Sequence, residues 1–456
     1  MLDQSFSVNN FRKIFDIENR KGIFPKYDFL NEVREITKEI KQCNVEINDK
    51  KKYIKTSDIE ELRKKKDELL VKKENVLTSE LQNLSEKVTT SSYNIDLKIL
   101  NIPNSKPIYT VEKLPEHFFV MKQLQYNVSK AFGVKQSNRN NIVSQVKILL
   151  SDGFPKCVLR TDIEDFYESI PHDKLFERIF GDNLLTPLSK KLLKHIIDQY
   201  KLLSGNVKGI PRGIGVSAYL SELYMRNIDN AIMSLKGVTY YARYVDDIII
   251  IFTPSTSEKD CFSEVLEDHY IGMIKEIIET KYNLLLNKSK TVFQDMTKKQ
   301  DNKQINYLGY MFMVHNFKLT VWLSSKKMDK YKNRIVLAFK AFLSRYNVTE
   351  KKSRRLLLKR IRFLTTNTRL KNNKDNIMVG IYFSNRHLDD HSHIKELDDT
   401  LKEQIKKLST TINKDIYDKI KGQLIKYSFQ NGFKEKKFSP FTTKELTEIV
   451  KVWQNV

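Results

Sequence analysis

Two adjacent aspartates interrupt an otherwise apolar stretch in the middle of the chain. The stretch reads Tyr-Tyr-Ala-Arg-Tyr-Val-Asp-Asp-Ile-Ile-Ile-Ile-Phe over residues 240–252, with the acids at Asp246 and Asp247. β-Branched and aromatic residues on both sides favour strands, so we expect a hairpin with the acids at its tip. Such a turn would normally use Asn-Gly or Asp-Gly, and neighbouring carboxylates repel unless a cation neutralises them. The pattern therefore predicts a functional turn.

A second acidic turn lies upstream, after the apolar run that begins at residue 158. Period-two alternation puts Arg160, Asp162 and Glu164 on one face of a strand. An Asp-Asp pair alone is weak evidence, because many turns contain one. Together, Asp162, Asp246 and Asp247 are three carboxylates from two strands, a set that can hold two Mg²⁺ ions for phosphoryl transfer. We predict these three as catalytic residues and metal ligands.

The balance of charge indicates a polyanionic partner. The 456 residues include 80 Lys and Arg against 56 Asp and Glu, a formal net charge of +24, which favours DNA or RNA binding. Residues 326–375 hold 17 basic and three acidic residues on a helical pattern. A row of cations on helices would track phosphates without reading sequence, although an ordinary solvated helical face would look similar.

The coarse organisation is α+β. Residues 27–88 predict a helical hairpin, with leucines spaced near four and seven from Leu62 to Leu84, as in a structural arm or an oligomerisation element. We expect residues 116–150 to be helical, residues 158–323 to mix strands and helices, and the part after His387 to be helical.

The cysteines and the first residues exclude several classes. Cys43, Cys157 and Cys261 are far apart and lack the spacing of a zinc site or a disulfide framework. The N-terminal residues show no signal-peptide pattern, and no run of eighteen apolar residues occurs. We therefore expect a cytoplasmic protein that does not associate with a membrane.

Five segments, in chain order, resemble the successive palm motifs of reverse transcriptases. They are 162–170 (Asp-Ile-Glu-Asp-Phe-Tyr-Glu-Ser-Ile), 209–217 (Gly-Ile-Pro-Arg-Gly-Ile-Gly-Val-Ser), 244–247 (Tyr-Val-Asp-Asp), 287–291 (Asn-Lys-Ser-Lys-Thr) and 307–310 (Tyr-Leu-Gly-Tyr). The resemblance implies a right-hand polymerase with fingers, a palm of antiparallel sheet plus helices, and an α-helical thumb. The implied divisions are 1–95 (N-terminal helical extension), 96–157 (fingers), 158–323 (palm), 324–385 (basic thumb) and 386–456 (C-terminal helical region).

The same resemblance assigns roles to individual residues. Besides the three aspartates, the backbone carbonyl of Ile163 is the implied extra ligand for Mg²⁺ or Mn²⁺. Tyr167 corresponds to the bulky residue that excludes a 2′-hydroxyl, so deoxynucleotides are the implied substrates, although an aromatic side chain buried under the next helix is the alternative. The other implied nucleotide-binding residues are Arg139 at the triphosphate, Phe166 near the sugar, Arg212 and Gly213 near the nascent base pair, and Lys290 as a general acid toward pyrophosphate.

The resemblance also implies a primer grip and a set of nucleic-acid-binding residues. The implied primer grip is Tyr307, Leu308, Gly309 and Tyr310, whose aromatic rings could equally be palm core. The implied nucleic-acid-binding residues of the thumb are Arg354, Arg355, Lys359 and Arg360. The family often has glutamine where this chain has Arg212, and this departure raises the alternative of untemplated or protein-primed DNA synthesis.

Segments 16–22, 360–370 and 380–385 resemble bacterial antiphage-defence reverse transcriptases, in particular the smaller enzyme of a type 3 system that pairs two polymerases with a non-coding RNA. This resemblance implies DNA synthesis on that RNA in an antiviral response, with a companion reverse transcriptase in a homo- or hetero-oligomer. A non-catalytic RNA-binding scaffold is the alternative from another class, and the intact aspartates argue against it.

Overall fold

The computed structural model describes residues 2–20, 27–51, 56–102, 105–255, 258, 262–298, 302–370 and 377–454. The chain forms two compact units whose segments alternate along the sequence. Unit 1 comprises Met1–Gln136, Glu164–Asp229 and Tyr282–Leu285, and unit 2 comprises Ser137–Ile163, Asn230–Lys281 and Leu286–Val456. Because the units interleave, neither of them corresponds to one of the predicted divisions, which stay predictions.

Unit 1 is mostly helical. Its helices are α1 (Val8–Arg20), α2 (Asn31–Lys51), α3 (Thr56–Thr89), α4 (Pro115–Ala131), α6 (Phe166–Ser169), α7 (His172–Gly181), α8 (Pro187–Ser204) and α9 (Ser217–Met233), whose last turn belongs to unit 2. Strands β1 (Leu97–Leu100) and β2 (Ile108–Val111) form an antiparallel pair.

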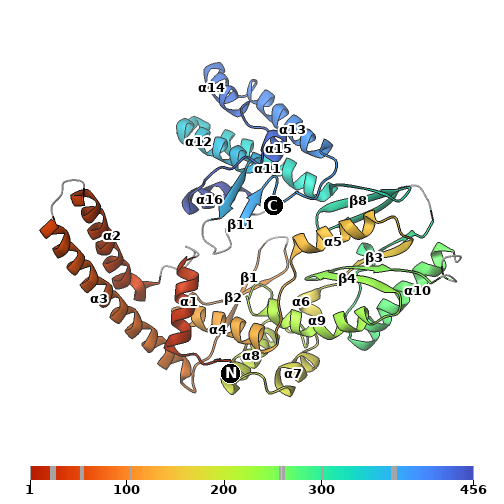
Figure 1. Ribbon diagram of the computed structural model, residues 1–456, viewed down its shortest axis with the longest axis horizontal. Coiled ribbons are helices and arrows are strands. Elements are labelled where there is room, and N and C mark those ends of the chain that lie inside the picture. Colours follow the sequence, from red (N-terminus) through yellow and green to blue (C-terminus); the bar gives the residue numbers. More distant parts are fainter. Residues whose placement is uncertain are drawn as a thin grey trace. The chain divides into compact units, whose positions relative to one another are not determined.

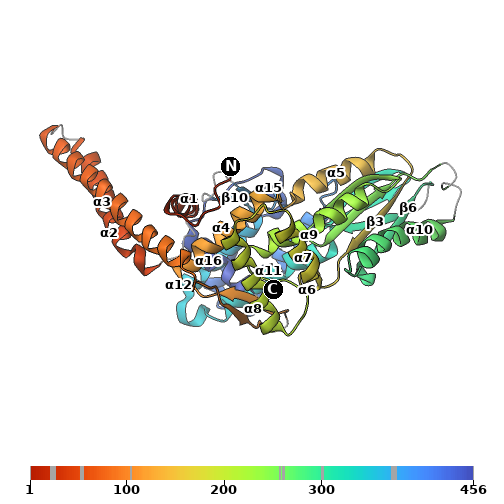
Figure 2. The same cartoon turned by 90° about the horizontal axis from the view of Figure 1, so that it is seen from below.

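The expected helical hairpin is present as α2 and α3, which lie side by side in both views (Figure 1, Figure 2). The apolar stripe of α3 is buried in its second half, at Leu77, Leu81, Leu84 and Val88. Residues spaced by three and four share one face of a helix, so the stripe packs while the charged residues stay in water. Leu62, in the first half of the helix, is only half-buried.

Unit 2 contains three antiparallel sheets. The strand order is β4-β5-β3-β6 in the largest, β7-β8-β9 in the second and β10-β11 in the third. The strands are β3 (Lys156–Asp162), β4 (Val238–Tyr244), β5 (Asp247–Phe252), β6 (Val292–Met296), β7 (Lys303–Tyr307), β8 (Tyr310–His315), β9 (Lys318–Leu323), β10 (Asn367–Leu370) and β11 (Ile377–Gly380). The helices are α5 (Arg139–Ser151), α10 (Ser263–Lys275), α11 (Ser325–Leu343), α12 (Tyr346–Thr365), α13 (Ser392–Leu408), α14 (Lys414–Leu424), α15 (Phe429–Lys434) and α16 (Thr443–Val450).

The central position of β5 explains its sequence. It pairs with β3 on one edge and β4 on the other, and all residues from Ile248 to Phe252 are buried. A strand covered on both faces reads as a continuous apolar run rather than an alternating one. The run of four isoleucines is therefore core, and it fixes the strand that begins at Asp247.

Three segments refine the sequence-based expectations. The stretch expected to be helical from 116 to 150 is two helices, α4 and α5, separated by a loop in which Gly133 has a φ of +62°. The basic stretch after Lys326 is helical through α11 and α12 but ends in the strand pair β10–β11, which the sequence reading lacked. The helices expected after His387 are present, and α13, α15 and α16 pack on α11 and α12. In the described part of the chain, none of the helices is long and apolar enough to cross a bilayer.

Candidate active site

The pairing of β3 with β5 gathers the three aspartates at one end of the largest sheet. Asp162 ends β3 and lies directly opposite Asp247, the first residue of β5. Directly opposite residues of an antiparallel pair point to the same face, with Cβ atoms about 4.5–5.5 Å apart. The backbone N–H of Ile163 donates to the carbonyl oxygen of Asp246 at 3.2 Å. Residues about eighty positions apart in sequence therefore share one site.

The turn that carries Asp246 is strained. Tyr244 pairs with Asp247, which leaves Val245 and Asp246 as a two-residue hairpin turn. Val245 has a φ of +63°, a conformation that β-branched residues disfavour and that glycine would adopt freely. The Arg243 guanidinium donates to the Val245 carbonyl at 2.8 Å and helps to hold it. Strain of this kind gathers at functional sites, as expected for this turn.

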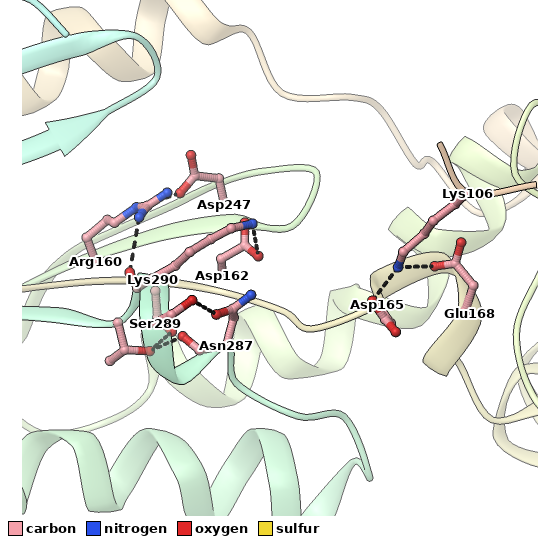
Figure 3. Close-up of polar contacts among 11 residues, drawn as sticks. Lys106, Arg160, Asp162, Asp165, Glu168, Asp247, Asn287, Ser289 and Lys290 are labelled. Carbon is pink, nitrogen blue, oxygen red and sulfur yellow. Dashed lines mark hydrogen bonds and ion pairs between the residues drawn. The ribbon is translucent and has the colours of Figure 1, made fainter. Parts of the chain in front are cut away.

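Two cations contact the carboxylates (Figure 3). Arg160 donates through Nε to Asp247 Oδ1 at 3.0 Å, and Lys290 donates through Nζ to Asp162 Oδ1 at 2.7 Å. A second nitrogen of Arg160 donates to the carbonyl oxygen of Lys290 at 3.0 Å. Arg160 therefore contacts both Asp247 and the backbone of the residue that pairs with Asp162. The role of Lys290 as a general acid stays a prediction, but the residue lies at the site.

The electrostatics favour a bound cation. Burial raises the pKa of Asp247 to about 6, the Arg160 guanidinium opposes this, and the charges of Asp162 and Asp246 raise the pKa further. A hard divalent cation would favour the ionised form, and carboxylate oxygens are the donors that such ions prefer. Across the described residues, no three or more His, Cys, Asp or Glu side chains are arranged as a metal site, and Asp162 and Asp247 are paired with Lys290 and Arg160. The donor set fits the metal; the ligand roles stay predictions.

The expected primer grip is the hairpin of β7 and β8. Tyr307 and Tyr310 are both buried, so their rings belong to the core, the alternative considered from the sequence. Tyr307 donates through its hydroxyl to the carbonyl oxygen of Asp247 at 3.1 Å, which ties this hairpin to the catalytic strand. Leu308 and Gly309 form the turn, with φ of +45° and +76°. Of the four predicted primer-grip residues, Leu308 and Gly309 are half-buried, and contact with a primer stays a prediction.

Arg139 contacts this turn. It donates to the carbonyl oxygen of Leu308, and its guanidinium carbon lies 5.6 Å from the centre of the Tyr310 ring. Lys327, which the sequence reading missed, lies 4.7 Å from the same centre and donates to the carbonyl oxygen of Ser384 at 2.8 Å. Burial lowers the pKa of Lys327 to about 7, helped by the Arg139 charge. The triphosphate contact predicted for Arg139 is untested.

Unit 1 contains the predicted sugar-discriminating residue. Phe166 is buried, whereas Tyr167 is half-buried, at the start of α6. Arg212 lies with its guanidinium carbon 5.6 Å from the Tyr167 ring centre and forms two hydrogen bonds to Glu168. The sequence alone gave no role to Glu168. The alternative of untemplated or protein-primed DNA synthesis, raised by Arg212, stays a prediction.

The neighbouring groups of unit 1 are also engaged. Lys106 contacts Asp165 and lies 3.6 Å from Glu168 (Figure 3). Gly213 has a φ of +100°, and a Cβ there would lie 2.7 Å from the carbonyl oxygen of Tyr109. The glycine is therefore required by its packing on β2, whatever it does toward a nucleic acid.

The four basic residues predicted on α12 differ in their surroundings. Arg355 is exposed. Arg354 is paired with Glu350 at 2.9 Å and Lys359 with Glu445 at 2.9 Å. Arg360 is only 6% exposed. These residues do not form one uniform phosphate-tracking face, and contact with nucleic acid stays a prediction for each.

The family is decided by a comparison with known families. The family described as "Reverse transcriptase (RNA-dependent DNA polymerase)" matches residues 71–312, more than half of the chain. The chain belongs to the reverse transcriptase family. No curated protein matches it.

Solved telomerase structures are also similar to this reverse transcriptase. Telomerase from Candida albicans, in complex with a TWJ fragment of telomeric RNA, is 13% identical with a TM-score of 0.34, over 81% of this chain and 65% of that one. Apo telomerase from Candida tropicalis is 13% identical with a TM-score of 0.38, over 79% and 67%. A form truncated from its C-terminal domain is 14% identical with a TM-score of 0.33, over 51% and 55%. The reverse transcriptase thus spans 65% of the first of these telomerase chains.

Family membership confirms two expectations. The mixture of helices and antiparallel sheets agrees with the right-hand polymerase fold of reverse transcriptases. The second is the family itself: reverse transcriptases are RNA-directed DNA polymerases, nucleotidyltransferases that generally use divalent metal ions.

Proposed function

We propose that this reverse transcriptase copies an RNA template into DNA at Asp162, Asp246 and Asp247, with Mg²⁺ as the metal and deoxynucleoside triphosphates as substrates. The observation that carries the proposal is the register of β3 and β5, which sets Asp162 opposite Asp247 beside the turn of Asp246. Two Mg²⁺ ions bound there would activate a 3′-hydroxyl and neutralise the leaving pyrophosphate.

The protein's own residues supply positioning and charge. Arg160 and Lys290 orient the carboxylates, and the Lys290 ammonium is a proton donor 2.7 Å from Asp162 Oδ1. The turn at Leu308 and Gly309 would hold the primer end, tied to the catalytic strand through Tyr307. Tyr167 would exclude ribonucleotides. Positioning and electrostatic stabilisation account for most of the rate in this chemistry.

Purified protein with an RNA template, a DNA primer, Mg²⁺ and deoxynucleotides tests the activity. We expect extension by the wild type and at least about 10³-fold less by Asp246→Asn, since metal neutralisation of the developing charge would fail. Asp198→Asn is the matched control, because Asp198 is exposed on α8, and it should extend normally. Equal extension by both variants would contradict the proposal.

We further propose that the template is a dedicated non-coding RNA and that the DNA serves bacterial antiviral defence, with a companion reverse transcriptase. The support is the resemblance of segments 16–22, 360–370 and 380–385 to antiphage reverse transcriptases. Sequencing of the co-purified RNA and DNA should return one transcript and its complement. Phage plating should show protection that Asp162→Ala removes; protection that survives this variant would favour a scaffold.

A further inference from the structure

A concave pocket opens in unit 2 between the end of α11, the start of α12 and the short 3₁₀ turn η5 (Lys451–Trp453). It encloses about 600 Å³. Four of its lining residues are cations: Arg345, Lys352, Arg360 and Lys451. None of the described residues that line it is acidic. Arg360 is buried and the other three cations are exposed, so positive charge gathers around one concave surface.

The nearby carboxylates face other partners. Glu350 is paired with Arg354 at 2.9 Å, and Glu445 is paired with Lys359 at 2.9 Å. Neither acid lines the pocket. Glu350 and Glu445 are thus both engaged with cations outside the pocket.

Arg360 is the buried cation of the pocket. Its side chain is only 6% exposed, and within the described part of the chain its one hydrogen-bond acceptor is the carbonyl oxygen of Ile449, 3.4 Å from Nε. Burial lowers its pKa, and the charge of Arg345 lowers it further. A buried cation costs free energy unless an anion pairs with it. An anionic ligand bound between Arg345 and Arg360 would relieve the repulsion between their charges.

Two side-chain hydroxyls of α12 add neutral groups to the pocket. α12 is interrupted at Thr349, where φ is −141° and ψ is 57°. The hydroxyls of Thr349 and Ser353 lie 3.2 Å apart, and both residues line the pocket. Hydroxyls and guanidinium groups together suit a tetrahedral oxyanion, and a guanidinium can bind two of its oxygens at once.

We propose that this pocket binds a phosphate group carried on a compact organic body, as in a mononucleotide or the terminal nucleotide of a strand. Leu356 and Val452 add half-buried apolar surface beside the cations, the combination that small-molecule sites use. The volume fits one nucleotide, whereas a duplex backbone would contact exposed side chains such as Arg355. The site is independent of the polymerase chemistry, so Asp246→Asn should bind the ligand like the wild type.

Isothermal titration calorimetry on the full chain tests this inference. The buffer contains EDTA, so that metals cannot hold a nucleotide at the aspartates. The probes are inorganic phosphate, AMP, and one short RNA with either a 5′-phosphate or a 5′-hydroxyl. We expect AMP to bind at one site. Binding that depends on the 5′-phosphate of the RNA would identify a strand end as the source, and equal binding of the two RNAs would identify a free nucleotide.

Variants distinguish AMP binding in the pocket from non-specific binding to the positive surface. Lys352→Ala and Lys451→Ala change exposed rim residues and should fold, and each should weaken AMP binding about tenfold or more, as expected for a lost charge-assisted hydrogen bond. Arg360→Met should abolish it. Arg355→Ala is the matched control, because Arg355 is exposed on the same helix and does not line the pocket; its affinity should stay within about twofold. The inference is overturned if the wild type binds none of the probes or if Arg355→Ala loses as much affinity as Lys352→Ala.

Discussion

Arg212 and Glu168 are joined at two points, with Nε 3.0 Å from Oε1 and Nη2 3.1 Å from Oε2. A two-point pair between a guanidinium and a carboxylate fixes orientation as well as distance. The guanidinium carbon lies 5.6 Å from the centre of the Tyr167 ring, and a cation at this distance is attracted to the face of the ring. The pair therefore positions Tyr167, the residue predicted to exclude ribonucleotides.

Replacement of Arg212 by glutamine should weaken sugar discrimination. The Tyr167 ring loses a cation contact of roughly 1 kcal/mol, so the preference for deoxynucleotides should fall by about threefold to tenfold. The measurement is the ratio of kcat/KM for a deoxynucleotide to that for the matching ribonucleotide. Glu168→Gln should lower this ratio as well, because it releases the Arg212 guanidinium.

Two controls accompany this series. Tyr167→Phe keeps the ring and should keep the discrimination, whereas Tyr167→Ala should remove it. Arg212→Lys keeps the charge but loses the planar fork and should fall between wild type and Arg212→Gln. A ratio that stays constant in both Arg212→Gln and Glu168→Gln would show that the pair does not act through Tyr167.

Lys290 should affect the chemical step rather than nucleotide affinity. Its Nζ lies 2.7 Å from Asp162 Oδ1, and a general acid typically contributes about 10²–10⁴-fold. We expect Lys290→Met to lower kcat about 10²-fold with KM nearly unchanged, measured by single-nucleotide incorporation. Lys288→Met, on the same short turn and exposed, should behave like the wild type.

The arginine variant separates the two roles of Lys290. Arginine keeps the positive charge beside Asp162 but holds its proton too tightly to release it. Lys290→Arg should therefore remain slow. Full activity in Lys290→Arg would mean that Lys290 only neutralises the carboxylate.

Much of the catalytic centre could be predicted from sequence, because its signals are local. The hairpin at Asp246 and Asp247 follows from a short turn between two apolar runs, and the helices α2 and α3 follow from their leucine spacing. The pairing of Arg212 with Glu168 could not be predicted in this way. The two residues are 44 positions apart, and either charge alone reads as a solvated surface side chain.

Other features depend on tertiary packing. Arg360 looks like its exposed neighbour Arg355 in the sequence, but it is buried where α12 packs on α16 and donates to the carbonyl oxygen of Ile449. The strand pair β10–β11 is short and each strand has four residues, too few for a clear alternation. Gly380 in β11 has a φ of +129°, which further weakens the local strand signal.

Lys327 should make stability depend on pH. Burial lowers its pKa to about 7 in the folded protein, from an ordinary value of 10.5. Below pH 7 both states carry the proton and the full cost of burying the charge is present. Between pH 7 and 10.5 the unfolded state binds more protons, so stability rises with pH. The slope cannot exceed about 1.4 kcal/mol per pH unit for one group.

Lys327→Met removes this titration. The urea midpoint of the wild type should rise relative to that of Lys327→Met as the pH is raised from about 7 to about 9. Lys326→Met, at the exposed neighbouring position, should show the wild-type dependence. Parallel midpoints for wild type and Lys327→Met across this range would contradict the lowered pKa.

Gly309 should be required for primer use beyond its effect on stability. Its φ is +76°, and an added Cβ would lie 3.0 Å from the Arg139 guanidinium and 3.1 Å from Cδ of Lys327. Gly133 has a similar φ of +62°, but a Cβ there would meet nothing within 4 Å. Both Gly309→Ala and Gly133→Ala should cost about 1 kcal/mol through the left-handed backbone. Only Gly309→Ala must also displace the two cations that border the turn, so it alone should raise the KM for primer–template in an extension assay. An equal rise in Gly133→Ala would trace the defect to general destabilisation and would remove the turn from the primer site.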